Sequence, residues 1–279
     1  MQGYRSIMVH VPADDAAGLP VGLAADLAQR FGARLIGIAA GDVALTMSVA
    51  SYGSASAQVI TLQMAELEEM LRAAEARFRG AAGAAGEHTE WRSFTEFPAT
   101  AVSREARAAD LLVMSPRRGA FGSNFISAAE PGDVLMQAGR PVLLVPPGIG
   151  HLPAARVLVA WKDRREARRA VQDALPLLAR AERVQVLEVC EPEESVADAE
   201  RRTADVAAYL RGHGARAESA ACARREPTAA RQIAAAATAL GADLIVAGGY
   251  GHARLREWIF GGVTRELMVH PACCCLLSH

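Results

Sequence analysis

Residues 242–251 read Ala-Asp-Leu-Ile-Val-Ala-Gly-Gly-Tyr-Gly, a short aliphatic run framed by an aspartate and a glycine cluster. An aliphatic run of this kind predicts a strand of a parallel sheet that is buried on both faces. The glycines that follow it predict a tight loop at the carboxyl end of that strand. Residues 109–114 read Ala-Asp-Leu-Leu-Val-Met, so the same pattern occurs earlier in the chain. The two segments together indicate an internal repeat.

Other segments repeat in the same order. The apolar runs at 6–11, 33–38 and 141–145 match those at 156–161, 183–189 and 273–277. Between the two halves, residues 146–153 are rich in proline and glycine, which is typical of a linker. We therefore predict one domain over 1–147, a linker over 148–154 and a second domain over 155–279.

Each half alternates short apolar runs with helical patterns, which predicts βαβ units and an α/β fold. In the second half we expect strands near 156–161, 184–190, 215–222, 243–248 and 273–278. Helices are expected near 165–181, 196–212, 227–240 and 263–270. The first half is longer, mainly because of a long helix near 57–79. Its apolar stripe is expected to pack in the core: Ile60, Met64, Leu67, Leu71, Ala74 and Phe78.

Composition excludes several classes of protein. The 30 Lys and Arg residues balance 31 Asp and Glu residues, so a surface that follows nucleic-acid phosphates is not expected. The only lysine is Lys162, and no Gly-Lys-Ser/Thr sequence occurs, so a Walker A loop is excluded. No apolar run reaches 18 residues, and we expect no membrane association. The first residues lack the pattern of a signal peptide, and an odd number of cysteines suits a reducing compartment, so we expect a cytoplasmic protein.

The segment 248–264 carries the main functional prediction. It follows the fourth strand of the second half and leads into a helix that begins near Val263. Ligands bind beyond the carboxyl ends of strands in open α/β sheets, and glycines let the backbone approach phosphate oxygens closely. The helix N-terminus directs free N–H groups toward the same place, and Arg254 and Arg256 add positive charge. The segment therefore predicts a phosphate-binding loop that needs no lysine.

Here the chain resembles the universal stress protein family. The nucleotide-binding signature of that family is Gly-x2-Gly-x9-Gly followed by Ser or Thr, and Gly248, Gly251 and Gly261 match its spacing. Gly262 stands where the family usually has a hydroxyl residue, and Thr264 follows two positions later. We expect Thr264 either to replace that phosphate contact or to cap the helix. Residues 161–170 also resemble the first turn and helix of the family, and an acidic residue there typically faces the ribose or base, which singles out Asp163.

The resemblance spans nearly the whole chain as a tandem pair of domains. It implies two Rossmann-like (adenine nucleotide alpha hydrolase-like) domains, each a five-stranded parallel sheet in the order 3-2-1-4-5. It also implies that the last strands, 141–146 and 273–278, pair within one chain as an internal pseudo-dimer, with a homodimer of chains as a further option. The implied ligand is ATP or another adenine nucleotide, with or without Mg²⁺. The nucleotide-binding residues implied are Ala160, Trp161, Asp163, Val189, Gly248, Gly251, His252, Arg254, Gly261, Gly262, Val263 and Thr264.

Three functions remain open from the sequence. The first is a nucleotide-binding stress-response protein with one site in the second half, the second is a slow ATP hydrolase, and the third is a scaffold that binds no nucleotide. We assign no catalytic residue and no metal ligand, and Lys162 is expected to face solvent or to meet a phosphate. Cys273, Cys274 and Cys275 are expected to be small buried residues, because only alternate side chains of a strand share a face.

The first half is expected to be a degenerate copy that is kept for packing. When Asp110 is aligned with Asp243, Ser115 and Arg118 fall opposite Gly248 and Gly251, so both glycines are lost. A second frame, Gly119, Gly122 and Gly132, has the correct spacing. However, that frame begins four residues too late, and the next residue, Asp133, would repel phosphate.

Overall fold

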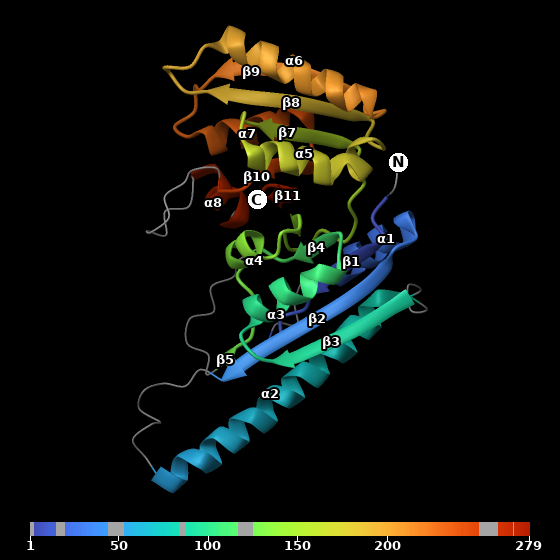
Figure 1. Cartoon of the computed structure of the whole chain (residues 1–279), viewed down its shortest axis with the longest axis vertical. Coiled ribbons are helices and arrows are strands. Elements are labelled where there is room, and N and C mark those ends of the chain that lie inside the picture. The colour runs from blue at the N-terminus through green and yellow to red at the C-terminus, as the bar shows by residue number, and fades with distance from the viewer. Residues whose placement is uncertain are drawn as a thin grey trace. The chain divides into compact units, whose positions relative to one another are not determined.

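The computed structural model describes residues 3–14, 20–43, 53–83, 88–116, 125–250, 262–269 and 271–279 (Figure 1). They divide into two compact units, Tyr4–Ala138 and Gly139–His279, and Gly3 belongs to the second. Both units have the predicted α/β architecture, in which helices flank a mainly parallel sheet.

The first unit has a parallel sheet of four strands in the order β3-β2-β1-β4. A short strand that the sequence did not predict, β5, pairs antiparallel with β2. The elements are β1 (Ser6–His10), α1 (Val21–Phe31), β2 (Arg34–Val43), α2 (Gly53–Ala82), β3 (Thr89–Thr95), α3 (Pro98–Glu105), a 3₁₀ turn (Ala106–Ala108), β4 (Leu111–Met114), β5 (Phe125–Ile126) and α4 (Pro131–Gln137).

The second unit has six strands in the order β6-β11-β10-β7-β8-β9. Numbered from β7, its five parallel strands follow the predicted order 3-2-1-4-5. The elements are β6 (Val142–Leu144), β7 (Arg156–Trp161), α5 (Arg165–Leu178), β8 (Arg183–Cys190), α6 (Val196–Gly212), β9 (Ala217–Ala223), α7 (Ala229–Leu240), β10 (Leu244–Gly248), α8 (Gly262–Val269) and β11 (Cys274–Ser278).

The strand β6, expected as the fifth strand of the first half, is grouped with the second compact unit. It pairs antiparallel with β11, so that Leu144 is opposite Cys275 and Val142 is opposite Leu277. The expected pairing of 141–146 with 273–278 is therefore confirmed. It gives the apolar edge of β11 a partner within the chain.

An aspartate at the start of the fourth strand holds the start of the first strand in both units. The Asp110 carboxylate accepts hydrogen bonds from the backbone amides of Arg5 and Ser6, at 2.7 and 3.0 Å. Asp243 accepts from the amides of Ala155 and Arg156 in the same way, at 2.8 and 3.3 Å. The repeat that the sequence indicated therefore has a physical basis, because each aspartate satisfies two backbone donors at the edge of the sheet.

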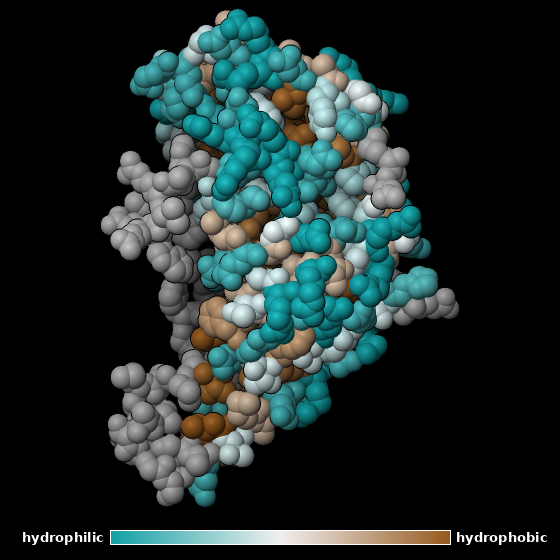
Figure 2. Space-filling model, viewed as in Figure 1, coloured by the Kyte–Doolittle hydropathy of each residue, from teal (hydrophilic) through white to brown (hydrophobic). Residues whose placement is uncertain are grey.

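The long helix α2 confirms only part of the predicted core stripe. Its second half buries Leu67, Leu71, Ala74 and Phe78. In its first half Ile60 is 36% exposed and Leu62 is 70% exposed, and hydrophobic residues show on the surface where α2 begins (Figure 2). A helix of 30 residues is about 45 Å long, which exceeds the length of the strands on which it packs.

The three consecutive cysteines are buried in and beside β11, as predicted. Burial raises the pKa of the Cys273 thiol to about 11 and that of Cys274 to about 12. The thiols are therefore uncharged at neutral pH and act as small apolar side chains. Within the described ranges, no cluster of three His, Cys, Asp or Glu side chains could hold a metal ion. None of the described helices is both long and apolar enough to cross a bilayer.

Candidate functional site

Several predicted site residues meet at the carboxyl edge of the second sheet. Ala160 and Trp161 end β7, Val189 lies at the end of the neighbouring strand β8, and Gly248 ends β10 on the other side. The register places Ala160 opposite Leu187 of β8 and Ala247 of β10. Order and register therefore bring three of the predicted segments together, as expected at a switch point of an open sheet.

Gly248 is required by close packing. A Cβ atom at this position would lie 2.5 Å from the backbone nitrogen of Ala167 and 2.7 Å from the carbonyl carbon of Glu166, both in the first turn of α5. Only glycine permits this approach without movement of the helix. The first glycine of the predicted signature therefore has a structural role that is independent of any ligand.

The loop that leaves β10 is fixed at its first residues. The Gly249 amide donates to the Ser278 carbonyl at 2.8 Å, and His279 Nδ1 lies 3.1 Å from the Gly249 carbonyl oxygen. Tyr250 adopts a left-handed conformation with φ +61°, which is uncommon for a residue with a side chain. The C-terminal strand and a sharp backbone turn therefore set the direction in which the loop begins.

The other end of the loop is tied back to its start. The Tyr250 amide donates to the Thr264 hydroxyl at 3.4 Å, and Thr264 is buried in the first turn of α8. Thr264 was expected to contact phosphate or to cap the helix. Its hydroxyl oxygen accepts this loop hydrogen bond, and its O–H is still able to donate. Beside it, Val263 is half-buried and Gly262 has open space around its Cα. The N-terminus of α8 is thus held next to the end of β10.

Four predicted binding residues lie outside the described residues. They are Gly251, His252, Arg254 and Gly261. The apolar run 258–260, expected either to cover a nucleotide or to pack on a helix, also lies there.

Asp163 lies two residues beyond the end of β7, where its side chain is accessible. Its Oδ1 is 2.5 Å from Nη2 of Arg168 in α5, and both side chains are about half exposed. An exposed ion pair of this kind contributes little to stability, so a ligand can replace either partner at small cost. Asp163 is therefore placed at the edge where it was predicted.

Lys162 makes ion pairs that the sequence did not predict. Its Nζ lies 2.6 and 2.5 Å from the two carboxylate oxygens of Glu194, and 3.7 Å from Oε1 of Glu188. The Lys162 side chain is also 42% exposed, so it faces solvent as well as these carboxylates. The Lys162 ammonium lowers the pKa of the Glu194 carboxyl, because it favours the charged form. The ion pair links the loop after β7 to the loop after β8.

Glu188 is the residue that the sequence analysis missed. It is 1% exposed, and the Arg202 guanidinium of α6 donates to both of its oxygens, at 3.1 and 2.7 Å. The bidentate contact raises the pKa of Arg202. A buried carboxylate needs such partners, because an unpaired charge would be strongly destabilising there. A glutamate inside the otherwise apolar run 186–190 was the signal that could have identified it.

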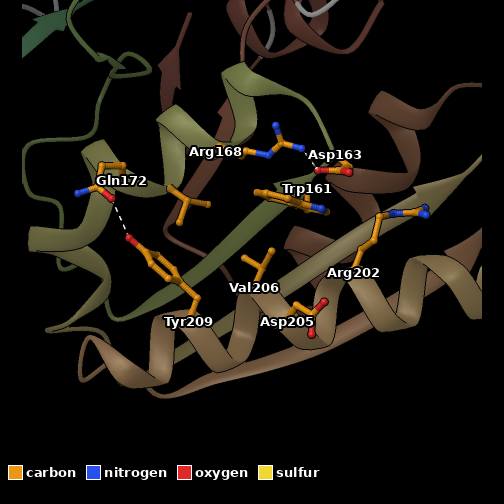
Figure 3. Close-up of a pocket in the computed structure, with 9 residues that line it drawn as sticks. Trp161, Asp163, Arg168, Gln172, Arg202, Asp205, Val206 and Tyr209 are labelled. Carbon is orange, nitrogen blue, oxygen red and sulfur yellow. Dashed lines mark hydrogen bonds and ion pairs between the residues drawn. The ribbon is translucent and has the colours of Figure 1, made fainter.

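A cavity of about 460 Å³ lies between α5 and α6, beside this edge (Figure 3). Trp161 lines it from β7, and its Nε1 is buried with no hydrogen-bond partner among the described residues. A buried donor without a partner costs about 1–3 kcal/mol. At one end of the cavity the Tyr209 hydroxyl donates to Oε1 of Gln172 at 2.7 Å. The remaining lining residues are Asp163, Arg168, Val171, Arg202, Asp205 and Val206.

The equivalent edge of the first unit is covered by its own chain. The carboxylates of Asp110 and Asp243 bind the amides of Ser6 and Arg156, so Ser6 and Arg156 are equivalent positions in the two units. The same number of residues further along the chain, the first unit has Ala13 and the second unit has Asp163. The Ala13 amide donates to the Ser127 carbonyl at 3.1 Å, and β5 pairs with the end of β2 at Val43.

A buried histidine holds the same covering segment. The Ala129 amide lies 3.4 Å from Nε2 of His10 at the end of β1 and donates to it. Burial lowers the pKa of His10 to about 4, so the ring is neutral at pH 7 and can accept this bond. Among the described residues, the first unit therefore has an alanine at the position of Asp163 and a segment of its own chain across this edge.

The comparisons with known proteins agree with this fold. Residues 154–279 match the model of the universal stress protein family. Over 97% of this chain and 95% of the other, the structure is similar to a universal stress protein from Archaeoglobus fulgidus, with a TM-score of 0.70 and 16% identity. A functionally unknown protein from Pseudomonas aeruginosa is similar over 99% and 93%, with a TM-score of 0.59 and 15% identity.

Those two likenesses extend over both units, and at this identity they establish the fold alone. No curated protein sequence matches the chain. The match to the family model is confined to the second unit, which also contains the glycine-loop spacing. The likeness to the universal stress protein family therefore rests on residues 154–279.

Proposed function

We propose that this protein is a nucleotide-binding stress-response protein that holds one ATP, or another adenine nucleotide, at the carboxyl edge of β7, β8 and β10. The observation that carries the proposal is the Tyr250–Thr264 hydrogen bond. It holds the N-terminus of α8 beside the end of β10. Free backbone N–H groups and the positive end of the helix dipole at that N-terminus favour phosphate groups.

The described residues fit the remaining parts of a nucleotide. Ala160 and Val189 provide apolar strand ends, and the Asp163 carboxylate can accept hydrogen bonds from ribose hydroxyls once Arg168 releases it. Gly251, His252, Arg254 and Gly261 complete the proposed loop. Asp163 could also hold Mg²⁺ through water, since this ion prefers carboxylate and phosphate oxygens.

The proposed role is regulatory. Nucleotide binding at this one site would shift an equilibrium between two conformations, or between the free and the partner-bound protein. The size of the shift is set by how much more tightly the nucleotide binds one of the two states. An internal pseudo-dimer of the two domains and a homodimer of chains are further proposals. We place the protein in the cytoplasm and expect neither nucleic acid nor membrane as a partner.

The test is a titration of ATP and ADP with and without Mg²⁺, together with assay of nucleotide extracted from the purified protein. One nucleotide per chain is expected. The matched variants are Gly262→Ser, which restores the hydroxyl of the family signature in open space, and Gly262→Ala, which adds only a methyl group. Gly262→Ser should tighten ATP binding about tenfold through one hydrogen bond to a charged oxygen, whereas Gly262→Ala should not.

Three outcomes would contradict the proposal. Two nucleotides per chain would place a second site in the first unit. If no nucleotide is extracted from the protein and none binds at millimolar ATP, the alternative function, a scaffold that binds no nucleotide, would be favoured. Phosphate release by the wild type that a Gly251→Ala variant lacks would favour the slow hydrolase.

A further inference from the structure

We propose that the first half of α2 is a docking surface for the same segment of a second copy of this chain, with the two helices side by side and antiparallel. The surface, which we call the α2 patch, comprises residues 58–66. The inference goes beyond the proposed function and does not depend on nucleotide binding, because α2 belongs to the first unit. It also differs from the β6–β11 pairing, which joins two strands of one chain.

The α2 patch exposes large apolar side chains. Val59 is 44% exposed, Ile60 is 36% exposed and Leu62 is 70% exposed. Figure 1 shows α2 extending past the ends of β2 and β3, and hydrophobic surface lies where the helix begins (Figure 2). Contact with the sheet is close at Leu67, because a Cβ atom on Gly41 of β2 would lie 2.5 Å from Leu67 Cδ1. The residues before Leu67 thus form helix while their apolar side chains stay largely accessible.

The composition of this half of the helix does not suit a surface that faces water. Residues 53–65 contain no Asp, Glu, Lys or Arg, whereas charged residues make up 22% of the chain. Charges begin at Glu66, and the second half of α2 carries both signs, as in the ion pair of Glu69 with Arg72. The solvent face of a helix normally carries charged and polar residues. An uncharged half with exposed apolar side chains therefore indicates that another protein surface covers it.

The spacing of three residues makes the α2 patch complementary to itself in the antiparallel orientation. Gln58, Leu62 and Glu66 are four positions apart, so they follow one face of the helix. With a two-fold axis at Leu62, the two leucines meet, and Gln58 of each copy faces Glu66 of the other. The amide of Gln58 can donate to the carboxylate of Glu66, and symmetry makes this hydrogen bond occur twice. A parallel pair would bring the two Glu66 carboxylates together, and they would repel each other.

A lipid bilayer fits the α2 patch less well. Helices that lie on membranes carry Lys and Arg beside the apolar face, and anionic headgroups attract these cations. Residues 53–71 contain no Lys or Arg, and three acids, Glu66, Glu68 and Glu69, follow the apolar residues. The first cation of the helix, Arg72, is paired with Glu69 at 2.7 Å. The charges therefore favour a second copy of the chain over an anionic membrane.

The size of the surface predicts a weak dimer. The uncharged half of α2 spans about 20 Å of helix axis. A pair of such segments buries much less than the roughly 800 Å² per partner of a standard interface. We therefore expect reversible association with a Kd of about 10–500 µM rather than a permanent dimer.

The first experiment is sedimentation equilibrium of the full-length protein over about 1–500 µM. We expect a reversible monomer–dimer equilibrium. Leu62→Glu should weaken dimerisation at least tenfold, because it places two like charges at the two-fold axis. The matched control Ala73→Glu adds the same charge at an exposed position in the other half of α2 and should leave dimerisation unchanged. Thermal unfolding of the dilute variants shows that both are folded, and we expect little change because both positions are exposed.

The second experiment tests the orientation of the two helices with Glu66→Gln. In the antiparallel pair this change replaces a charged acceptor by a neutral one, so dimerisation should weaken about threefold. In a parallel pair the same change would remove a repulsion and tighten the dimer. Neither Leu62→Glu nor Glu66→Gln should alter the affinity for ATP, so this inference and the proposed function can fail separately.

The inference is overturned if the protein stays monomeric over the whole concentration range, if Leu62→Glu leaves the dimer intact, or if Glu66→Gln tightens it. Two other occupants would also overturn it. A monomer that binds phosphatidylglycerol vesicles, and loses them in Leu62→Glu, would assign the α2 patch to a membrane. A monomer that binds a helical peptide of leucine and lysine in the same Leu62-dependent way would assign it to a basic partner.

Discussion

At the scale of single residues, glycines that share one signature have different physical roles. Gly248 is in close contact with the backbone of α5, whereas Gly262 has no atom near the position of a Cβ. The two substitutions to alanine are therefore a matched pair. Gly248→Ala should lower the free energy of unfolding by about 1–3 kcal/mol, because the added methyl must displace the helix. Gly262→Ala should leave it unchanged or slightly higher, because alanine favours a helix. Thermal and urea unfolding would measure both, and equal losses would refute the packing argument.

His10 should make stability depend on pH. Its pKa is about 4 in the folded protein against 6.5 for the ordinary imidazole, so protons bind the unfolded state more readily. The contribution of the neutral ring is complete above pH 6.5 and is lost as the pH falls toward 4. At pH 5 the loss relative to pH 7 should reach about 2 kcal/mol. Urea unfolding of the wild type and of His10→Gln at both pH values would measure it, and identical pH dependence would contradict the prediction.

The site could be predicted only as far as backbone spacing determines it. The glycine spacing located Gly248 at the edge of the sheet, and the family resemblance pointed to Trp161 and Asp163 at the same edge. Partners that depend on three-dimensional packing were missed. Lys162 meets Glu194 across 32 positions of sequence, and the Thr264 hydroxyl is used by Tyr250. No short-range pattern specifies which charged side chain of one loop will reach another, because that depends on how the two loops pack.

At the scale of elements, α2 is the clearest case in which periodicity overestimated the core. The apolar stripe continues along the helix, but the sheet beneath it does not. Leu67→Ala, in the buried half, should cost about 2–5 kcal/mol of stability through lost packing. Leu62→Ala, at a position that is 70% exposed, should cost almost nothing. Chemical denaturation of both variants compares them directly, and a large loss for Leu62→Ala would mean that the first half of α2 is covered.

Most strands could be predicted from the sequence. Each parallel strand of the second sheet was expected at its place in the chain, and the strand order followed from the family resemblance. The short strand β5 escaped prediction, because two residues carry no periodicity.

At the scale of the whole molecule, the position of β6 predicts how the chain can be divided. A fragment that begins at Gly139 keeps β6 on β11, whereas one that begins at residue 155, the predicted domain start, exposes that edge. The longer fragment should be more stable by at least about 2 kcal/mol, since burial of Val142, Leu143 and Leu144 is retained. Thermal unfolding would compare them, and equal stability would show that β6 is dispensable.

The ion pair between Lys162 and Glu194 has a practical consequence for work on this protein. Because the chain has no other lysine, reagents that acylate primary amines can modify only this side chain and the α-amino group of the first residue. The Lys162 amine reacts only when it leaves its carboxylate partner and loses a proton. Its acylation rate, read by mass spectrometry of a single peptide, is thus a built-in chemical reporter of how often the two loops separate. A reporter dye attached there would sit directly at the edge of the sheet, without any engineered residue.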